Sequence, residues 1–399
     1  MDKAAVLMRD RLVSFTGLAL MVALILATVE IAAYFYSTYL ARRYGILFYL
    51  PQITEDYATY AARVNPRLGW PSSQALQKQQ DDMIAMASAP GTDLTKIDRE
   101  FPISAYGDSF TAGFGVKPEY AWSNVLGRML GCHIANYGIP GYGTDQAYLR
   151  FHDNNQDGAK IVLFGVLSEN IQRNVNQLRN FLIPSSQCQT KPRFVLDNQG
   201  HVQFVPLPKL TAQNYEDFIQ NPDHYLSHDY FVPGGPSGAQ KLEFPYTWSI
   251  LKAHKFFYDR YVLGYKSYLQ FYLPHHPSQA FPLTLAIIKQ CISEVQKRGK
   301  HPIVLVFPTD EDFRVYHRHF VYAPLIHALK REHIEYIDLG TEILKRLGSR
   351  SYMELFLGGQ YHHFNENGNK LVARILFDYF KAKRYLPVSV QETATLPPG

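Results

Sequence analysis

Cysteine is scarce in this sequence, and so are charged residues. The three cysteines, Cys132, Cys188 and Cys291, lie far apart and form no Cys-x-x-Cys pair. This spacing excludes a disulfide-rich scaffold and a cysteine-based zinc module, although one disulfide beside a free thiol stays open. Charged residues make up 19% of the chain, which is below the roughly one quarter that is usual for soluble proteins.

The charges are also spread along the chain without a block of one sign. The 40 basic and 35 acidic residues leave a net charge of +5. Because nucleic-acid-binding domains carry clustered Lys and Arg, nucleic acid is not an expected partner. The hydrophobic fraction of 46% excludes a disordered chain, since disordered segments lack the apolar surface that offsets the entropy cost of ordering.

One apolar run is long enough to cross a membrane. Residues 12–29 (LVSFTGLALMVALILATV) contain no charge, and a helix of that length measures about 27 Å, close to the bilayer hydrocarbon thickness of about 30 Å. Glu30 interrupts the run, and the tyrosines and phenylalanine at 34–39 suit the aromatic belt of a membrane interface. We predict an uncleaved transmembrane anchor over residues 12–40; the alternatives are a cleaved signal peptide or a buried core helix.

The basic residues that flank this run predict its orientation. Three of them precede the run and two follow it: Lys3, Arg9, Arg11, Arg42 and Arg43. Positively charged flanks are retained in the cytoplasm, so residues 1–11 are expected inside and the rest of the chain outside. This predicts a single-pass protein of the cytoplasmic membrane whose main domain lies in the periplasm.

The remaining chain is expected to form a stem at 41–98, a domain at 99–385 and a disordered tail at 386–399. In the domain, segments with the pattern of strands alternate with segments of helical spacing. Strands are expected at 102–106, 133–138, 160–166, 301–308 and 334–339. Helices are expected at 121–130, 144–154, 282–299, 321–332 and after Asn367-Gly368 as far as Lys383. This alternation predicts right-handed βαβ units around a parallel sheet, in a three-layer α/β/α domain.

Residues 175–280 break the alternation. The segment FVLDNQGHVQFV at 194–205 predicts a β-hairpin that turns at 197–200. The Lys-Pro-Arg at 191–193 before it is expected to be a solvated loop, with a small anion site as the alternative. An insertion of this length in an α/β domain typically forms a cap or a wall that faces the substrate.

Residues that could act in catalysis follow the predicted strands, at the sheet edge where open α/β folds bind ligands. Ser109 comes directly after the first strand, where a hydroxyl is presented beside backbone N–H groups. A glycine-rich segment at 136–144 follows the second strand, Ser-Glu-Asn at 168–170 follows the third, and His362 and His363 precede the last helix. A serine, glycine N–H groups, an amide and a histidine are the parts needed for acyl transfer through a serine ester.

The order of these segments resembles the SGNH (GDSL-type) hydrolase family over residues 99–385. Gly-Asp-Ser at 107–109 matches the family's nucleophile block, NYGIPGYGTDQ at 136–146 its second block, and HFNENGN at 363–369 its histidine block. The serine lacks the G-x-S-x-G pattern, which argues against the α/β-hydrolase fold. The resemblance implies a flavodoxin-like three-layer domain.

The resemblance also implies a role for each matching residue. Ser109 is expected to be the nucleophile and His363 the base. The N–H groups of Ser109 and Gly141, together with the amide of Asn170, are expected to form the oxyanion hole. Ser109 as an ordinary helix-capping serine is the alternative.

Two positions depart from the family's pattern. The third block, usually Gly-x-Asn-Asp, is Gly-Val-Leu-Ser-Glu-Asn at 165–170, in which Asn170 supplies the amide. The residue three before His363 is Gln360 instead of Asp. A glutamine can hold the imidazole tautomer but cannot stabilise the imidazolium by charge. Glu169 or Glu354 could substitute as the carboxylate, or the site could work as a Ser–His dyad.

These observations predict a membrane-anchored serine esterase that acts on an ester of a glycan or lipid. An O-acetyltransferase of an envelope polysaccharide and a catalytically inactive SGNH-fold binding or assembly protein stay open as alternatives. No cofactor is expected. No metal is expected either, because adjacent histidines such as His362 and His363 rarely bind one ion and no third ligand is evident.

Overall fold

The computed structural model describes residues 3–44, 47–71, 74–76, 78, 102–258, 268–358 and 362–385. The predicted tail at 386–399, Gln360 and most of the second half of the predicted stem lie outside these described residues. The chain divides into two compact units, each described by itself below. The first comprises residues 1–55, 180–188 and 210–266, and the second comprises residues 56–179, 189–209 and 267–399.

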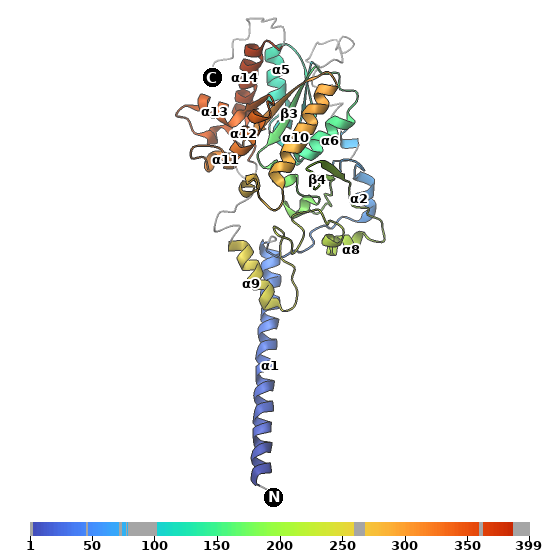
Figure 1. The fold of residues 1–399 in the computed structure, drawn as a ribbon, viewed down its shortest axis with the longest axis vertical. Coiled ribbons are helices and arrows are strands. Elements are labelled where there is room, and N and C mark those ends of the chain that lie inside the picture. Colours follow the sequence, from blue (N-terminus) through green and yellow to red (C-terminus); the bar gives the residue numbers. More distant parts are fainter. Residues whose placement is uncertain are drawn as a thin grey trace. The chain divides into compact units, whose positions relative to one another are not determined.

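A five-stranded sheet forms the centre of the second unit (Figure 1). Its strands are β1 (Ile103–Tyr106), β2 (Ile134–Asn136), β3 (Ile161–Leu167), β6 (His301–Phe307) and β7 (Tyr336–Asp338). They lie in the order β2-β1-β3-β6-β7, and each neighbouring pair is parallel. This is the 2-1-3-4-5 order of flavodoxin-like folds, in which ligands bind where the strand order reverses. The predicted parallel sheet is confirmed by this pairing. The apolar runs that predicted β3 and β6 are buried, as is usual for parallel strands covered on both faces.

Helices cover both faces of the sheet. The longer ones are α5 (Trp122–Leu130), α6 (Thr144–Asp153), α10 (Ala280–Lys297), α12 (Ala323–Arg331), α13 (Leu339–Leu347) and α14 (Glu366–Lys383). On one face α14 packs against α5 and α13, and on the other α10 packs against α6 and α12. The three-layer α/β/α prediction is therefore confirmed. Of these six longer helices, α13 was not predicted; it begins directly after β7, where the Asp338 side chain accepts a hydrogen bond from the N–H of Thr341.

The second unit also contains short helices and the predicted hairpin. The short helices are α2 (Tyr57–Arg63), α4 (Ser109–Ala112), α7 (Asn170–Arg173) and α11 (Asp310–Arg314). Strands β4 (Arg193–Leu196) and β5 (Val202–Val205) pair antiparallel. Their turn is closed by Asp197, whose side chain accepts hydrogen bonds from the N–H groups of Gln199 and His201. The hairpin prediction is confirmed.

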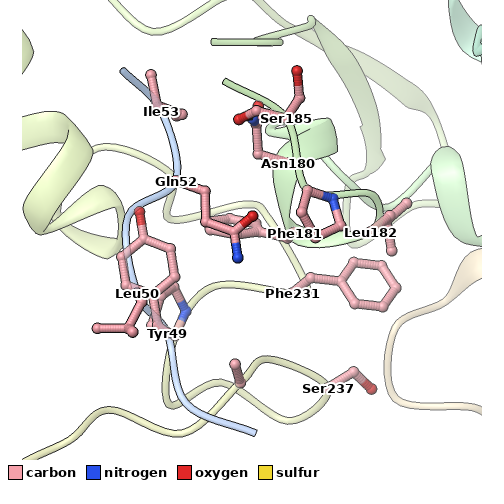
Figure 2. A pocket seen from close by; sticks show the side chains of 13 residues that line it. Tyr49, Leu50, Gln52, Ile53, Asn180, Phe181, Leu182, Ser185, Phe231 and Ser237 are labelled. Atoms are coloured by element: carbon pink, nitrogen blue, oxygen red, sulfur yellow. The ribbon is translucent and has the colours of Figure 1, made fainter. Parts of the chain in front are cut away.

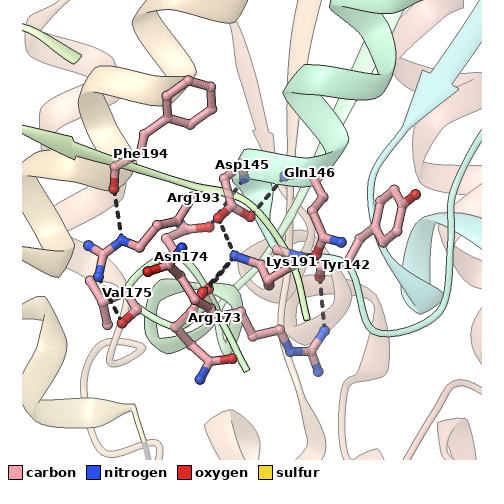
Figure 3. A network of polar contacts seen from close by, with 12 residues as sticks. Tyr142, Asp145, Gln146, Arg173, Asn174, Val175, Lys191, Arg193 and Phe194 are labelled. Atoms are coloured by element: carbon pink, nitrogen blue, oxygen red, sulfur yellow. Dashed lines mark hydrogen bonds and ion pairs between the residues drawn. The ribbon is translucent and has the colours of Figure 1, made fainter. Parts of the chain in front are cut away.

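A buried ion pair holds the segment before this hairpin (Figure 3). The side chains of Lys191 and Asp145 are 1% and 0% exposed and form a hydrogen-bonded ion pair. The Lys191 ammonium also donates to the carbonyls of Arg173 (3.1 Å) and Asn176 (2.9 Å). The expectation of a solvated Lys-Pro-Arg loop was wrong, because three acceptors together compensate the cost of burying this charge.

The first unit contains the N-terminal helix α1 (Lys3–Tyr44), α8 (Tyr215–Gln220) and α9 (Tyr246–Phe257). Residues Phe15–Arg43 of α1 are long and apolar enough to cross a membrane. The carboxyl-terminal part of α1 packs on α9, where Leu40, Ala41, Phe48 and Ala253 form a small core (Figure 1).

A pocket of about 100 Å³ also lies within the first unit (Figure 2). The segment that follows α1 forms one wall with Tyr49 and Leu50, and Phe181 and Phe231 come from other segments of the same unit. The lining is mostly apolar. None of the predicted catalytic residues lines this pocket, so the candidate site is sought at the sheet edge of the second unit.

Candidate active site

Ser109 is the first residue of α4, directly after the tight turn that follows β1. Asp108 caps α4, because its carboxylate accepts hydrogen bonds from the N–H groups of Phe110 (3.0 Å) and Thr111 (3.4 Å). Ser109 is thus the first residue of the helix and is not needed as its cap, contrary to the alternative considered from the sequence. The turn requires glycine at 107, where a Cβ atom would lie 2.0 Å from Oγ1 of Thr111.

The structure brings Ser109 and His363 together. Nε2 of His363 lies 2.8 Å from Oγ of Ser109, although 254 residues separate them in sequence. The imidazole ring packs between the rings of Phe110 and Phe114, with centroids 5.1 and 5.3 Å away. His362 is instead exposed and forms an ion pair with Asp310 at 2.7 Å. Of the two adjacent histidines, only His363 has this contact with the serine.

The surroundings of the second ring nitrogen of His363 bear on whether the ring can accept a proton. Its Nδ1 atom is buried and has no hydrogen-bond partner among the described residues. Gln360, the predicted partner, lies outside those residues. Burial lowers the pKa of His363, and the Arg173 charge lowers it further, while the negative charge of Glu169 partly opposes both. The imidazole is therefore held in its neutral form, which can accept a proton.

Asn170 begins α7, directly after the turn that follows β3, and its side-chain amide has a defined orientation. Its Oδ1 accepts a hydrogen bond from Nη1 of Arg173 at 3.0 Å. A guanidinium can only donate hydrogen bonds, so it must face the amide oxygen. The Nδ2 group of Asn170 is buried and has no partner among the described residues. An unpartnered N–H donor at this sheet edge is what an oxyanion hole requires.

Arg173 was not identified from the sequence, yet its guanidinium joins three loops at the sheet edge. It donates to Glu169 at 2.8 Å and to the carbonyl of Tyr142 at 3.2 Å, a contact drawn in Figure 3. It also lies 3.5 Å from the carboxylate of Asp108. These contacts connect the loops after β1, β2 and β3. In the sequence, Arg173 could have been found from its position three residues after Asn170, because that spacing places both side chains on one face of a helical turn.

The two carboxylates beside Arg173 respond differently to burial. Burial raises the pKa of Asp108 to about 6, and the Arg173 charge and the two backbone N–H groups offset only part of that rise. Burial would also raise the pKa of Glu169, but the charge of Arg173 and its hydrogen bond outweigh this effect and lower it. Glu169 is therefore the firmly ionised partner of Arg173.

Gly141 lies in the loop after β2, next to the nucleophile turn. The N–H of Ile139 donates to the carbonyl of Gly107 at 3.1 Å, which holds the two loops together. Gly141 has a φ of +86°, and a Cβ atom there would lie 2.9 Å from Cζ of Arg179. The left-handed φ favours glycine, and a Cβ atom would also have to displace the Arg179 guanidinium.

Arg179 is a second cation that sequence analysis missed. Its Nη1 donates to Gln189 at 3.1 Å, while its buried Nε has no partner among the described residues. Burial, together with the charge of Arg173, lowers the pKa of Arg179 to about 10, and Glu169 opposes this. The loop of Gly141 is thus bordered by a guanidinium that has an unused donor.

This arrangement contains the parts of a nucleophilic centre. A hydroxyl hydrogen-bonded to a neutral imidazole can attack a carbonyl carbon while the imidazole takes its proton. Asn170 and the backbone N–H groups at the strand ends can stabilise the oxyanion that forms. Across the described parts of the chain, no group of three or more His, Cys, Asp or Glu side chains is placed to hold a metal ion.

No protein-family model matches the sequence, and no curated protein matches it either. Solved structures match it at low identity. A putative acylhydrolase from Bacteroides fragilis is 11% identical, and the match covers 79% of this chain and 99% of that one with a TM-score of 0.36. A lipolytic protein of the G-D-S-L family from Veillonella parvula is 12% identical, and the match covers 70% of this chain and 97% of that one with a TM-score of 0.36. An α/β-hydrolase enzyme from the metagenome of Lake Arreo, Spain, is 13% identical, and the match covers 71% of this chain and 95% of that one with a TM-score of 0.37.

The charges around His363 predict a shift in the pH dependence of ester hydrolysis. His363 accepts a proton only when neutral, and Glu169 is the charge that keeps its pKa from falling further. Glu169→Gln retains an acceptor for Arg173 but removes that charge. We expect the acid limb of the kcat/KM profile for p-nitrophenyl acetate to move to lower pH, with activity otherwise retained.

Glu354→Gln is the matched control. Glu354 is exposed, so removal of its charge should leave the pH profile unchanged. A shift of the Glu169→Gln limb to higher pH would contradict the electrostatic argument. A near-complete loss of activity in this variant would mean that Glu169 itself orients the histidine.

Proposed function

We propose that this chain is a membrane-anchored serine ester hydrolase of the SGNH type, with Ser109 as nucleophile and His363 as base. The observation that carries the proposal is the 2.8 Å contact between Oγ of Ser109 and Nε2 of His363. It occurs at the carboxyl edge of a parallel sheet with flavodoxin-like strand order, where such folds bind their ligands. The lowered pKa of His363 supports its role as a base.

The proposed reaction begins when His363 removes the Ser109 proton as Oγ attacks the ester carbonyl carbon. The N–H groups of Ser109 and Gly141 and the amide of Asn170 stabilise the resulting oxyanion. The intermediate collapses, His363 returns the proton to the departing alcohol, and an acyl-serine remains. His363 then activates water, which attacks the acyl-serine and releases the acid.

Gln360 is proposed to hold the imidazole. The buried Nδ1 of His363 needs an acceptor for its proton when Nε2 faces Ser109. Gln360 is three residues away in sequence, and its Oε1 can accept that hydrogen bond. An amide there fixes the tautomer without stabilising the imidazolium by charge, so the centre would be a weaker base than a Ser-His-Asp triad.

The proposed location is the outer side of the cytoplasmic membrane. The helix segment Phe15–Arg43 supports anchoring by its length and composition. The basic residues Lys3, Arg9 and Arg11 before the apolar run support a cytoplasmic N-terminus. An ester of an envelope glycan or lipid is then the proposed substrate class, because such compounds are exposed at the membrane surface.

An active-site probe tests the nucleophile directly. A fluorophosphonate should label the wild-type protein and leave Ser109→Ala unlabelled, because only a serine activated by a base reacts with it. Ser168→Ala is the matched control: Ser168 also follows a strand, but its hydroxyl donates to Asp312. It should be labelled like the wild type, provided that its thermal unfolding is unchanged. The proposal would be refuted if Ser109→Ala were labelled as strongly as the wild type, or if the wild type were not labelled at all. An unlabelled wild type would favour a binding protein.

The amide of Asn170 should be needed for turnover more than for binding. We expect Asn170→Ala to lower kcat for p-nitrophenyl acetate by about 10²–10³-fold, the cost of removing one oxyanion donor, with little change in KM. Asn170→Asp keeps the acceptor for Arg173 but lacks the N–H group, and should lose a similar factor. Activity of both variants close to the wild-type value would exclude Asn170 from the oxyanion hole.

Restoring a carboxylate beside His363 should strengthen the base. Loss of the triad aspartate in a serine protease lowers kcat by about 10⁴, and we expect Gln360→Asp to recover a smaller factor because its surroundings are not tuned for a charge. Gln360→Ala should lower hydrolysis mildly, and His363→Ala should abolish it. An inert Gln360→Asp together with a crippled Glu354→Gln would assign the orienting role to Glu354. Loss of activity in His362→Ala alone would show that His362 is the base.

A further inference from the structure

The outward face of α9 carries large apolar side chains. Residues 246, 249, 250 and 253, which have helical spacing, are buried or partly buried against α1 and its neighbours. The opposite face exposes Trp248 and Leu251, and the exposed Phe244 and Tyr258 flank the helix; we call these four residues the outer face. Single exposed apolar residues are normal on proteins, but several large ones gathered on one short helix indicate a surface that meets another apolar phase.

Basic residues accompany this patch. Lys252 and Lys255 are exposed on the same helix, and the Lys252 ammonium lies 5.9 Å from the centroid of the Trp248 ring. Tryptophan and lysine are both found at membrane interfaces, where the ring lies at the level of the headgroups and the ammonium reaches their phosphates. The charge suits anionic headgroups, and the aromatic rings suit the boundary of the acyl chains.

Glu30 fixes the start of α9 to α1. Its carboxylate accepts hydrogen bonds from the N–H groups of Tyr246 (2.6 Å) and Thr247 (3.4 Å) and from the Thr247 hydroxyl. A carboxylate at this position satisfies free N–H groups and interacts favourably with the helix dipole. The only acidic residue between 12 and 43 is therefore used to attach α9.

Ring contacts show that α9 runs alongside the end of α1. The rings of Tyr34 and Tyr246 are 5.1 Å apart, and those of Tyr36 and His254 are 6.3 Å apart. The start of α9 is therefore level with residues 30–34 of α1, and its end is level with the residues near 36–41 (Figure 1).

The length of α1 then sets the depth of α9. A hydrocarbon layer of about 30 Å takes about 20 helical residues, so a span that begins at residue 12 ends near residue 31. That end coincides with Glu30 and with the first turn of α9. Phe244 and Trp248 lie nearest the acyl chains, while Lys252 and Lys255 lie farther along α9, where long basic side chains reach the headgroups.

We propose that α9 is a second membrane-contacting element, which lies in the lipid interface beside α1 and places Phe244 and Trp248 against the acyl chains. The occupant of the outer face is the bilayer, because ring contacts lead from Phe244 through Tyr246 and Tyr34 to Phe35, and both aromatic side chains of the apolar helix are exposed. The inference rests on the proposed anchoring by α1 and is independent of the chemistry of Ser109.

Trp248 provides a direct reporter of this contact. The chain has three tryptophans; Trp70 and Trp122 are buried, whereas Trp248 is 57% exposed. The full-length protein is reconstituted into nanodiscs of phosphatidylcholine and phosphatidylglycerol, with or without brominated acyl chains. Brominated lipid should quench emission by up to about one third, the share of one tryptophan in three, and aqueous iodide should quench little.

Two variants assign the signal. Trp248→Phe should abolish quenching by brominated lipid, and Trp70→Phe should retain it. Quenching of Trp248 by iodide and not by brominated lipid would place the outer face in water and overturn the proposal. Protection from both quenchers would mean that a protein surface covers the face, which also overturns it.

The anchoring itself is checked separately, on isolated membranes that contain the protein. Extraction of the wild-type protein from membranes by alkaline carbonate would overturn both the anchoring and the role of α9. Failure of the esterase proposal is seen separately, as absence of fluorophosphonate labelling at Ser109, and does not affect lipid quenching.

Discussion

The guanidinium of Arg173 lies where three loops at the carboxyl edge of the sheet meet, and the polar groups around it depend on its charge. It binds Glu169, the Asn170 oxygen and the Tyr142 carbonyl, and it lies close to the Asp108 carboxylate. Without it, Glu169 would lose its partner and only backbone N–H groups would offset the buried charge of Asp108, a cost that buried charges rarely sustain. Because arginine only donates, it faces the Asn170 oxygen, and the Asn170 N–H group has no partner among the described residues.

The backbone of Arg173 is held as firmly as its side chain. Its carbonyl accepts a hydrogen bond from Lys191, whose ammonium is paired with Asp145 at the start of α6. Buried polar contacts thus connect α6 with the nucleophile turn through Lys191 and Arg173. For the proposed oxyanion hole, such contacts would hold the donors in place before a substrate binds.

The first unit uses a charge in a comparable way. An acidic residue in an apolar helix is costly unless a partner satisfies it, and Glu30 finds that partner in the first N–H groups of α9. The sequence marked Glu30 only as an interruption of the apolar run. Its partner lies 216 residues away, so local sequence patterns carried no information about it.

Periodicity was sufficient to predict the parallel sheet and the hairpin, because these depend on local patterns and on a fixed topology. Strand-end position indicated Ser109 and the two adjacent histidines as candidates, and the family resemblance selected His363 as the partner of Ser109. The tertiary structure alone decided that His362 turns away to Asp310 and that Arg173 and Arg179 border the site. Those contacts join segments distant in sequence, and their geometry depends on packing, which hydrophobic periodicity does not encode. The role of Gln360 remains a prediction from its spacing to His363.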